Sequence, residues 1–519
     1  MKKVIPYGRQ SIDKSDIKSV TKALKSNPKS VIVLCNLADA LVKIERMDEA
    51  VKLLKSAKRI NKAFVPIYSR LGNIFKKTEK YKLSALYFKK ALKLDPENDS
   101  LYNNLGVALQ ALKKFKEAIK YYKKAVRINP KNFKAFYNMG TSQTKVSCYK
   151  DAINCFYKAL DIESEFPDAY FGIGRAFAGL GNQKEALINY RKTLKLNPKH
   201  FKALRSMAWP YILQYKFTVG WKHYEYRWQE AIQKWPIKDK DLWDGQESKR
   251  IVLWREQGIG DDLLFLGLVP EAFERCKTLS VYLDPRLIPL CKRSMPGINF
   301  KEYKEKIEEE EVDYHLPMGS LPRLFRNSEK DFDRTIKGYL KADKNRVELL
   351  REELDLKGKK VIGISWKSTK SLNKAKKSLE LIELAPVFKD LDVVFLNLQY
   401  GDVDEEIREF KKATGIEVLQ CASVDNREDL DGLAALIEVC DLVVSTSNVT
   451  IHLAGALAKE TWVLLPYVAN FWWLIDRSDS LWYPTLKLYR QKKFGDWFSV
   501  YSEVTNKLKK KLCINSEII

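Results

Sequence analysis

Two short stretches of the chain hold residue types that could carry out chemistry. The first is residues 257–261, Gln-Gly-Ile-Gly-Asp, between an expected strand and an expected helix. Gly258 and Gly260 would let a ligand approach the backbone closely, and a helix N-terminus favours negative charge. Asp261 would stand where the strand ends, at the face where ligands of α/β proteins bind, although aspartate is also a common helix N-cap. Both interpretations of Asp261 stay open at this point.

The second stretch is residues 445–457, Ser-Thr-Ser-Asn-Val-Thr-Ile-His-Leu-Ala-Gly-Ala-Leu, in which a polar turn again separates a strand from a helix. The amides and hydroxyls of such a turn could receive a diphosphate. His452 would fall in the first turn of the helix, where a neutral imidazole could donate to a phosphate oxygen. A single histidine is more often a packing residue, yet this is one of only four in the chain.

The elements around these stretches belong to an α/β arrangement. From Arg250 onward, short apolar runs alternate with amphipathic segments, which is typical of parallel α/β units. A polar stretch between Arg326 and Lys360 separates two sets of strands, so the sequence predicts two α/β lobes. We expect the strands at Ile251–Trp254, Leu279–Leu283, Val312–Leu316, Val361–Ser365, Val393–Leu398, Glu417–Gln420, Leu442–Ser445 and Thr461–Leu465.

The first two-fifths of the chain, from Val31 to Gln229, follows a 34-residue period. Small residues at fixed positions would let two antiparallel helices approach, aromatic rings would fill the space beside them, and proline would end the second helix. The recurring glycines are Gly72, Gly106, Gly140 and Gly174, and the prolines are Pro96, Pro130 and Pro198. This pattern resembles the tetratricopeptide repeat and predicts an α-helical solenoid.

Each helical hairpin of such an array buries its apolar face only against its neighbours, so the array needs a cap at each end. We expect the caps near residues 11–28 and 220–228, and the bulky rings of the second cap would dock the array onto the next domain. The predicted domains are a repeat array at 1–230, a linker at 231–249, a first lobe at 250–340 and a second lobe at 341–519. The C-terminal helix could pack back on the first lobe.

The first helix of each repeat would line a concave surface, and asparagine occupies its sixth position in three repeats, at Asn36, Asn104 and Asn138. An asparagine amide offers a donor and an acceptor together, so this broken row could clamp the backbone of an extended peptide. The alternative is that asparagine is simply common at this inner position. We expect a protein or polypeptide partner on this surface.

The charge balance bears on the choice of partner. The chain holds 92 Lys and Arg residues against 66 Asp and Glu residues, a net charge of +26 that could indicate a polyanionic partner. The lysines are scattered over helical surfaces, however, and no recognised nucleic-acid-binding motif accompanies them. We therefore expect a solvated, lysine-rich surface, no nucleic-acid partner and at most peripheral contact with an anionic membrane.

The eight cysteines form no Cys-x-x-Cys pair and follow no disulfide framework, so they are expected to be reduced. The N-terminus is basic but lacks the apolar region of a secretory signal, and no apolar run approaches the roughly 20 residues that span a bilayer. These features predict a cytoplasmic protein without a transmembrane segment.

Six motifs come after the repeats: Ile-Val-Leu-Trp-Arg-Glu-Gln-Gly-Ile-Gly-Asp-Asp at 251–262, Ile-Gly-Ile-Ser-Trp-Lys at 362–367, Lys-Ser-Leu at 377–379, Leu-Gln-Tyr-Gly-Asp at 398–402, residues 444–457, and Trp-Tyr-Pro at 482–484. With the repeats, they resemble the bacterial proteins that fuse tetratricopeptide repeats to a heptosyltransferase-like glycosyltransferase domain. The layout is also similar to the O-linked N-acetylglucosamine transferase, in which repeats present a polypeptide to a sugar-transferring GT-B fold. The resemblance covers nearly the whole chain and implies a GT-B-like domain of two Rossmann-like lobes.

The resemblance implies roles for particular residues. It gives Asp261 the place of the general base that takes a proton from the acceptor hydroxyl. Lysine charge would offset the charge that develops on the leaving nucleotide diphosphate, so that neither a metal nor a cofactor is expected beside the nucleotide-sugar substrate. The sequence holds no cluster of His, Asp and Glu at the spacing of metal ligands, so it does not indicate a metal site. The implied donor-phosphate and nucleotide contacts are Gly258, Gly260, Lys367, Ser368, Lys377, Gln399, Tyr400, Ser447, Asn448, Val449, Thr450 and His452.

Heptosyltransferases usually carry Asp-Thr-Gly before the histidine helix, whereas this chain has Ser447-Asn448-Val449. A hydroxyl and an amide can bind phosphate or sugar, but they cannot supply a carboxylate. Two functions are therefore expected. One is an inverting, metal-independent glycosyltransferase whose acceptor, a protein or a glycan, is recruited by the repeats. The other is a non-catalytic repeat scaffold with a degenerate transferase-like domain.

Overall fold

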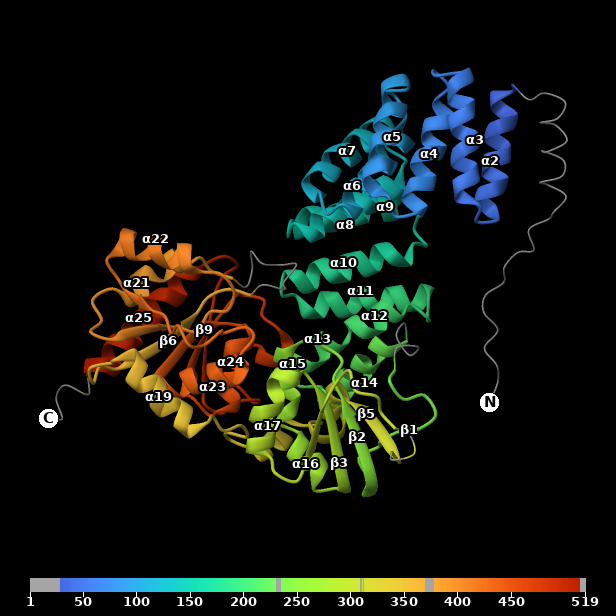
Figure 1. Cartoon of the computed structure of the whole chain (residues 1–519). Helices are drawn as coiled ribbons and strands as arrows, with labels where there is room; N and C mark the ends of the chain where they lie inside the picture. The colour runs from blue at the N-terminus through green and yellow to red at the C-terminus, as the bar shows by residue number, and fades with distance from the viewer. Residues whose placement is uncertain (1–28, 230–234, 309, 311, 369–377, 514–519) are drawn as a thin grey trace. The chain divides into compact units, whose positions relative to one another are not determined.

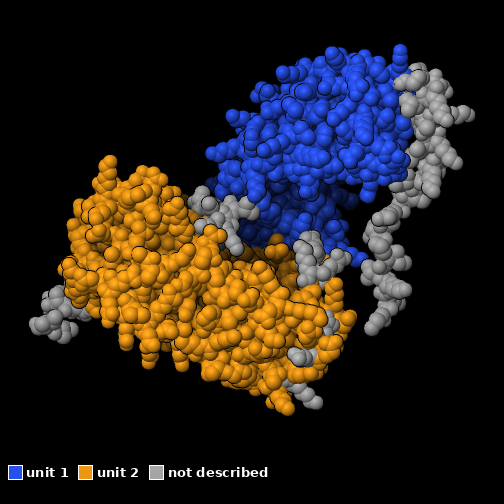
Figure 2. Space-filling view, in the orientation of Figure 1, with its two compact units in different colours: residues 1–203 blue, residues 204–519 orange. Residues whose placement is uncertain are grey.

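The computed structural model describes residues 29–229, 235–308, 310, 312–368 and 378–513 (Figure 1). The chain divides into two compact units, one ending at Ala203 and the other beginning at Leu204 (Figure 2). No helix among the described residues is long and apolar enough to cross a membrane.

The first unit is a stack of helical hairpins (Figure 1). Each hairpin pairs a helix of 13 residues with a following helix of 14 residues. This arrangement confirms the predicted α-helical solenoid, while the cap expected at residues 11–28 lies outside the described residues. The helices are α2 (Val31–Lys43), α3 (Met47–Ile60), α4 (Val65–Lys77), α5 (Tyr81–Leu94), α6 (Asp99–Ala111), α7 (Phe115–Ile128), α8 (Phe133–Lys145), α9 (Tyr149–Ile162), α10 (Pro167–Gly179) and α11 (Gln183–Leu196).

The repeated glycines are the points where a buried ring of the second helix meets the first helix. A β-carbon on Gly106 would lie 2.5 Å from Cε1 of Tyr122, and one on Gly72 would lie 2.7 Å from Cε1 of Phe88. Both rings are fully buried. Since any side chain at the glycine positions would overlap the ring, the 34-residue period follows from the packing of each hairpin.

The last helical pair belongs to the second unit. Its first helix is broken into α12 (Phe201–Ser206) and α13 (Ala208–Ile212), and its second is α14 (Phe217–Tyr224), continued by the 3-10 turn η1 (Glu225–Trp228). The division between the units falls inside α12, so only residues 201–203 of this pair lie in the first unit. Trp221 of α14 is 1% exposed, and its Nε1 donates to the carbonyl oxygen of Arg326 at 2.5 Å. Its ring packs against Trp472 and Trp482. The rings of residues 220–228 therefore lie in or beside the α/β core.

The first sheet of the second unit has five parallel strands in the order β1-β5-β2-β3-β4. The strands are β1 (Asp241–Leu242), β2 (Ser248–Trp254), β3 (Cys276–Leu283), β4 (Asn299–Glu302) and β5 (Tyr314–Pro317). Its helices are α15 (Ile259–Leu266), α16 (Val269–Phe273), α17 (Ile288–Ser294) and α18 (Leu321–Phe325), with 3-10 turns η3 (Pro285–Leu287), η5 (Met318–Ser320) and η6 (Glu329–Arg334).

The described part of the predicted linker, residues 235–249, is built into this sheet. It contains β1 and the start of β2, and the side chains of Ile237 and Trp243 are 0% and 1% exposed. The linker prediction was wrong for these residues, because two buried apolar side chains within a polar stretch were enough to anchor an edge strand.

The second sheet has six parallel strands in the order β11-β10-β9-β6-β7-β8. The strands are β6 (Val361–Ser365), β7 (Val394–Asn397), β8 (Val418–Leu419), β9 (Leu442–Thr446), β10 (Thr461–Leu465) and β11 (Leu486–Arg490). Its helices are α19 (Lys344–Leu354), α21 (Ala385–Phe388), α22 (Asp404–Thr414), α23 (Leu430–Val439), α24 (Val449–Ala456) and α25 (Trp497–Cys513), with 3-10 turns η7 (Leu381–Leu384) and η8 (Phe471–Trp473).

The C-terminal helix α25 packs on the second sheet. Val500, Val504 and Leu508 are buried in the core cluster formed by that sheet, and Thr505 Oγ1 donates to the carbonyl oxygen of Pro386 in α21 at 3.4 Å. The expectation that this helix packs on the first lobe is therefore corrected, since its apolar face is covered by the second.

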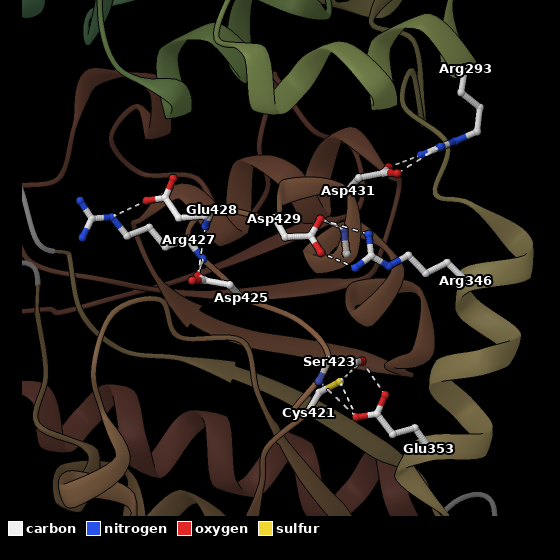
Figure 3. A network of polar contacts seen from close by, with 11 residues as sticks. Arg293, Arg346, Glu353, Cys421, Ser423, Asp425, Arg427, Glu428, Asp429 and Asp431 are labelled. Atoms are coloured by element: carbon white, nitrogen blue, oxygen red, sulfur yellow. Dashed lines mark hydrogen bonds and ion pairs between the residues drawn. The ribbon is translucent and has the colours of Figure 1, made fainter.

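Charged side chains also join the two sheets of this unit. Figure 3 shows Arg293 of α17, beside the first sheet, reaching Asp431 of α23, beside the second. Arg346 of α19 forms a bidentate contact with Asp429, which directly precedes α23. Paired arginine–carboxylate contacts fix orientation as well as distance, so they fix the positions of α17 and α19 relative to α23.

Candidate functional site

Each sheet has one place where the strand order reverses. In the first sheet the chain passes from β2 through β3 to β4 on one side, and β5 lies on the other side of β2. In the second sheet β7 and β8 follow β6 on one side, and β9, β10 and β11 follow one another on the other side of β6. Ligands of open parallel sheets bind outside the carboxyl ends of the strands at such reversals. The loops there are residues 255–258 in the first sheet, and residues 366–368 and 447–448 in the second.

At the first reversal, the loop after β2 leads directly into α15, which begins at Ile259 rather than after Asp261. Gly258 is the N-cap residue, and its backbone N–H donates to Oδ2 of Asp261 at 3.3 Å. Asp261 is therefore a capping residue in this structure. Its carboxylate also lies near Tyr224: burial raises the pKa of Tyr224, and Asp261 adds to the rise.

A second carboxyl group comes directly after Asp261 in the chain. Asp262 is 2% exposed and lies 2.9 Å from Arg255, which also pairs with Asp284 at 3.0 Å. Burial raises the pKa of Asp262 to about 8, the neighbouring carboxylates Asp261 and Asp284 add to the rise, and Arg255 opposes it. A proton held by Asp262 near neutral pH would lower the negative charge around Asp261.

At the second reversal, Asn448 joins the end of β6 to the start of α24. Its Oδ1 accepts from the Thr450 N–H at 3.0 Å, and its Nδ2 donates to Ser365 Oγ at 2.7 Å and to the carbonyl oxygen of Lys367 at 3.2 Å. Thr450 is fully buried, and its hydroxyl lies 3.3 Å from Ser365 Oγ. The asparagine of the Ser-Asn-Val stretch therefore caps the helix and fixes the turn.

Other residues expected to contact the donor are engaged inside the protein. Gln399 is 2% exposed, its Oε1 accepts from the backbone N–H groups of Trp366 and Lys367 at 2.9 and 2.7 Å, and its Nε2 donates to the carbonyl oxygen of Tyr400. The predicted contact of Gln399 with the nucleotide stays a prediction, and in the structure its amide holds the loop after β6. Tyr400 beside it is half-buried.

The lysines of this region differ in what surrounds them. The Lys367 ammonium forms an ion pair with Glu406 of α22, and the backbone N–H of the next residue, Ser368, donates to Ser378 Oγ at 3.0 Å. Lys377 lies outside the described residues. Nothing in the sequence pointed to the Glu406 pairing, since Glu406 is one of three acidic residues in the first turn of an amphipathic helix.

His452 is held by two aromatic residues that the sequence alone did not assign to the site. Its Nδ1 lies 3.0 Å from Tyr483 Oη, and its ring stacks on Trp473 at 5.6 Å between centroids. Trp473 Nε1 in turn donates to Ser447 Oγ at 2.9 Å. Burial raises the pKa of Tyr483 well above its usual range, and a hydrogen bond with Tyr339 adds to the rise, so its hydroxyl stays protonated beside Nδ1. The Trp-Tyr-Pro motif at 482–484 was the signal that could have found Tyr483.

The two reversals are brought together by helix packing. A β-carbon on Gly260 of α15 would lie 3.2 Å from Cδ2 and 3.7 Å from Nε2 of His452 in α24. Asp261 follows Gly260 directly, so the carboxylate of the first sheet and the imidazole of the second lie on helix turns that touch. Val449 and Ser447, at the start of α24, are partly exposed beside them.

The asparagine row of the first unit links neighbouring repeats. Asn104 Oδ1 accepts from Lys76 Nζ at 3.2 Å, Asn138 Nδ2 donates to Asn103 Oδ1 at 2.9 Å, and Asn36 is exposed. A groove of about 410 Å³ lies between the first helices of two repeats, α2 and α4. It is lined by Asp39, Val42, Arg70, Asn73, Ile74, Lys76 and Lys77.

No three or more His, Cys, Asp or Glu side chains come together as a metal site within the part of the chain that the structure describes.

Comparison with known proteins identifies the repeats. The tetratricopeptide repeat family matches residues 32–64, 100–132 and 167–200, and a further TPR repeat matches residues 72–113. The chain is 30% identical over 312 residues to Protein FlbA of Caulobacter vibrioides, across 56% of this chain and 52% of FlbA. The chain thus spans about half the length of that relative.

Solved structures of repeat proteins are also similar. YrrB, described as a TPR protein with an unusual peptide-binding site, is 26% identical, covers 37% of this chain and 98% of its own, and has a TM-score of 0.33. MamA is 23% identical, covers 33% of this chain and 94% of its own, and has a TM-score of 0.31. The family matches and the helical hairpins together show that the first unit is an array of tetratricopeptide repeats, a module for protein–protein interaction.

Proposed function

We propose that the second unit is an inverting, metal-independent glycosyltransferase of the GT-B type, and that the repeat array recruits its acceptor. The observation that supports this most is the contact between Gly260 and His452, because it joins the strand-order reversals of two parallel sheets. A donor bound at one reversal would then lie next to an acceptor bound at the other, as a transfer reaction requires.

The second reversal suits the donor. The first turn of α24 leaves backbone N–H groups without helical partners, and a diphosphate is well accommodated at such a helix start. Ser447 and Val449 are partly exposed there, and the buried Tyr483 hydroxyl sets the orientation of the His452 imidazole. In the tautomer with Nδ1 unprotonated, Nε2 carries the proton and could donate to a phosphate oxygen.

The first reversal suits the acceptor, with Asp261 as the base. Asp261 would take the proton of the acceptor hydroxyl as its oxygen forms a bond to the anomeric carbon. The bond from that carbon to the diphosphate oxygen breaks, and the nucleoside diphosphate leaves with the electron pair. Attack from the face opposite the leaving group inverts the configuration at the anomeric carbon.

A non-catalytic scaffold is the second candidate, and a specific observation favours it. Asn448, Gln399 and Lys367 already satisfy one another or other protein groups at the donor reversal. A bound diphosphate would have to compete with Glu406 for the Lys367 ammonium. If the second unit is a scaffold, the repeat array carries the function alone and the α/β unit supports its last helical pair.

The test is to incubate the purified full chain with a panel of nucleotide sugars and the corresponding nucleoside diphosphates. The proposal expects saturable binding of a nucleoside diphosphate, seen as a rise in thermal unfolding temperature, and release of that diphosphate when an acceptor is present. If the protein neither binds nor turns over any member of the panel, the scaffold is favoured.

A further inference from the structure

The positive charge of the protein is concentrated in the repeat array. Residues 31–203 hold 34 Lys and Arg residues against 15 Asp and Glu residues, whereas residues 204–519 hold 50 against 49. Residues 1–30 hold the remaining 8 Lys and Arg residues against 2 Asp and Glu residues. The α/β unit is therefore close to neutral, and most of the net positive charge, +19 of +26, lies in residues 31–203.

Part of this charge faces the groove between repeats. Lys76 and Lys77 line the groove between α2 and α4. By the 34-residue period, Lys145 of α8 occupies the position of Lys77, and Arg175 of α10 occupies the position of Asn73, which also lines the groove. We call Lys76, Lys77, Lys145 and Arg175 the inner basic residues.

The inner basic residues lack acidic partners within the described part of the array: no carboxylate lies at ion-pair distance from any of them. Arg70 differs, since it pairs with Asp39 in the same groove at 2.8 Å. Lys76 is half-buried, and its Nζ donates to the amide oxygen of Asn104 at 3.2 Å. An ammonium partly removed from water with only a neutral acceptor gains from an added carboxylate.

The effect of this placement is visible in the lysines themselves. Burial lowers the pKa of Lys76. Burial lowers the pKa of Lys145 as well, and the like charge of Arg175 adds to that shift. Both shifts reflect ammonium groups partly removed from water, and an anion bound along the first helices would oppose them.

We propose that the array binds an extended, acidic polypeptide segment along the inner basic residues. A groove of about 410 Å³ between two helices admits side chains but neither a flat bilayer surface nor a nucleic-acid duplex. The asparagines between the basic residues can hydrogen-bond to a peptide backbone while the lysines and Arg175 meet its carboxylates. This inference deepens the proposed recruitment of an acceptor, and it rests on that role of the array, not on the transfer chemistry.

The test uses the full chain and a short fluorescent peptide of alternating Glu and Ser, with the Gln and Ser peptide as its neutral counterpart. The acidic peptide should bind at least about tenfold more tightly by fluorescence anisotropy, and added salt should weaken it. Lys76→Gln combined with Arg175→Gln should remove most of this preference. Lys116→Gln combined with Lys120→Gln is the matched control. It removes the same amount of charge from exposed positions of α7, the second helix of its repeat, and should leave binding within about twofold.

Three results would overturn the inference: equal binding of the two peptides, equal loss in the α7 variant, or tighter binding of phosphatidylserine vesicles or single-stranded DNA than of the acidic peptide. Circular dichroism of both variants checks that the helices persist. Asp261→Asn should bind the acidic peptide normally, because Asp261 lies in the other unit. Sugar transfer without any preference for acidic peptides would leave the proposed function standing and remove this inference alone.

Discussion

A β-carbon on Gly260 would lie 3.2 Å from Cδ2 of His452, closer than side chains ordinarily approach. Glycine is thus the residue that lets the first turns of α15 and α24 touch. The imidazole cannot move freely to make room, because Trp473 stacks on one face and Tyr483 contacts Nδ1. The position of Asp261 relative to His452 therefore depends on the missing side chain at residue 260.

Gly260→Ala should destabilise the second unit and weaken nucleotide binding. Alanine favours a helix over glycine by about 1 kcal/mol, so a net loss would show that the clash with His452 outweighs this gain. We expect a loss of about 1–3 kcal/mol, typical of overpacking a filled site, measured by urea unfolding.

Gly258→Ala is the matched control. A β-carbon there meets only Oδ2 of Asp261 at 3.7 Å, which is ordinary contact, and the backbone φ of −91° suits alanine. The change should cost less than about 1 kcal/mol, mainly through a poorer N-cap. Equal losses of stability in the two variants would mean that the contact with His452 is not what destabilises Gly260→Ala.

Asp261→Asn tests the proposed base while keeping the helix cap. The amide oxygen of asparagine can still accept from the Gly258 N–H, so stability should change by less than about 1 kcal/mol. An amide cannot take up the acceptor proton, and the rate of sugar transfer should fall by about 100-fold or more, with nucleotide binding preserved. A variant with full activity would exclude Asp261 as the base.

Stability should depend on pH through Asp262. Its pKa is raised to about 8 in the folded protein, while in the unfolded chain it returns to about 4. Between these values the folded state binds more protons, so the free energy of unfolding falls as pH rises, by up to about 1.4 kcal/mol per pH unit. Asp262→Asn should flatten this slope in urea titrations, whereas Asp390→Asn, at an exposed position, should not. A flat wild-type profile would mean that Arg255 keeps Asp262 ionised.

The repeat array offers a test of its own packing. Gly106→Ala places a methyl group 2.5 Å from the fully buried Tyr122 ring and should lower stability by about 1–3 kcal/mol. Tyr122→Phe removes only a hydroxyl that donates to Gln110 at 3.1 Å, and Phe88 and Phe156 already occupy this position in neighbouring repeats. It should cost about 1 kcal/mol, as a single hydrogen bond does. Thermal unfolding followed by circular dichroism compares the stability of the two variants. A larger loss of stability in Tyr122→Phe than in Gly106→Ala would contradict this prediction.

The sequence predicted the central strands well and the edges poorly. The strands β6 and β10 have the predicted bounds, because both are continuous apolar runs covered on both faces. The edge strand β4 reads Asn-Phe-Lys-Glu, and β11 reads Leu-Lys-Leu-Tyr-Arg, so polar residues on an exposed face hid them. The start of α15 was placed too late because Gly258 and Gly260 suggested a longer loop.

For the candidate site, the sequence places the two loops between a strand and a helix but does not reveal the pairings within them. A strand, a polar turn and a helix follow one another locally, and that order places residues 257–261 and 445–452 at the reversals. The hydrogen bond from Asn448 to Ser365 spans 83 residues, and the ion pair of Lys367 with Glu406 joins separate elements. Such contacts depend on the register between strands and helices that are distant along the chain.

The burial of Trp221 has a consequence for how such a protein can be assembled from parts. Its ring lies among Trp472 and Trp482, so the last helical pair of the repeat pattern belongs physically to the α/β core. A genetic exchange that replaced the array up to residue 230 would remove this ring and open the core. Exchange at Ala203, where the division between the two units falls, would keep this ring with the α/β core. Arrays of different length or specificity can therefore be inherited with this domain only if its own final hairpin stays with it.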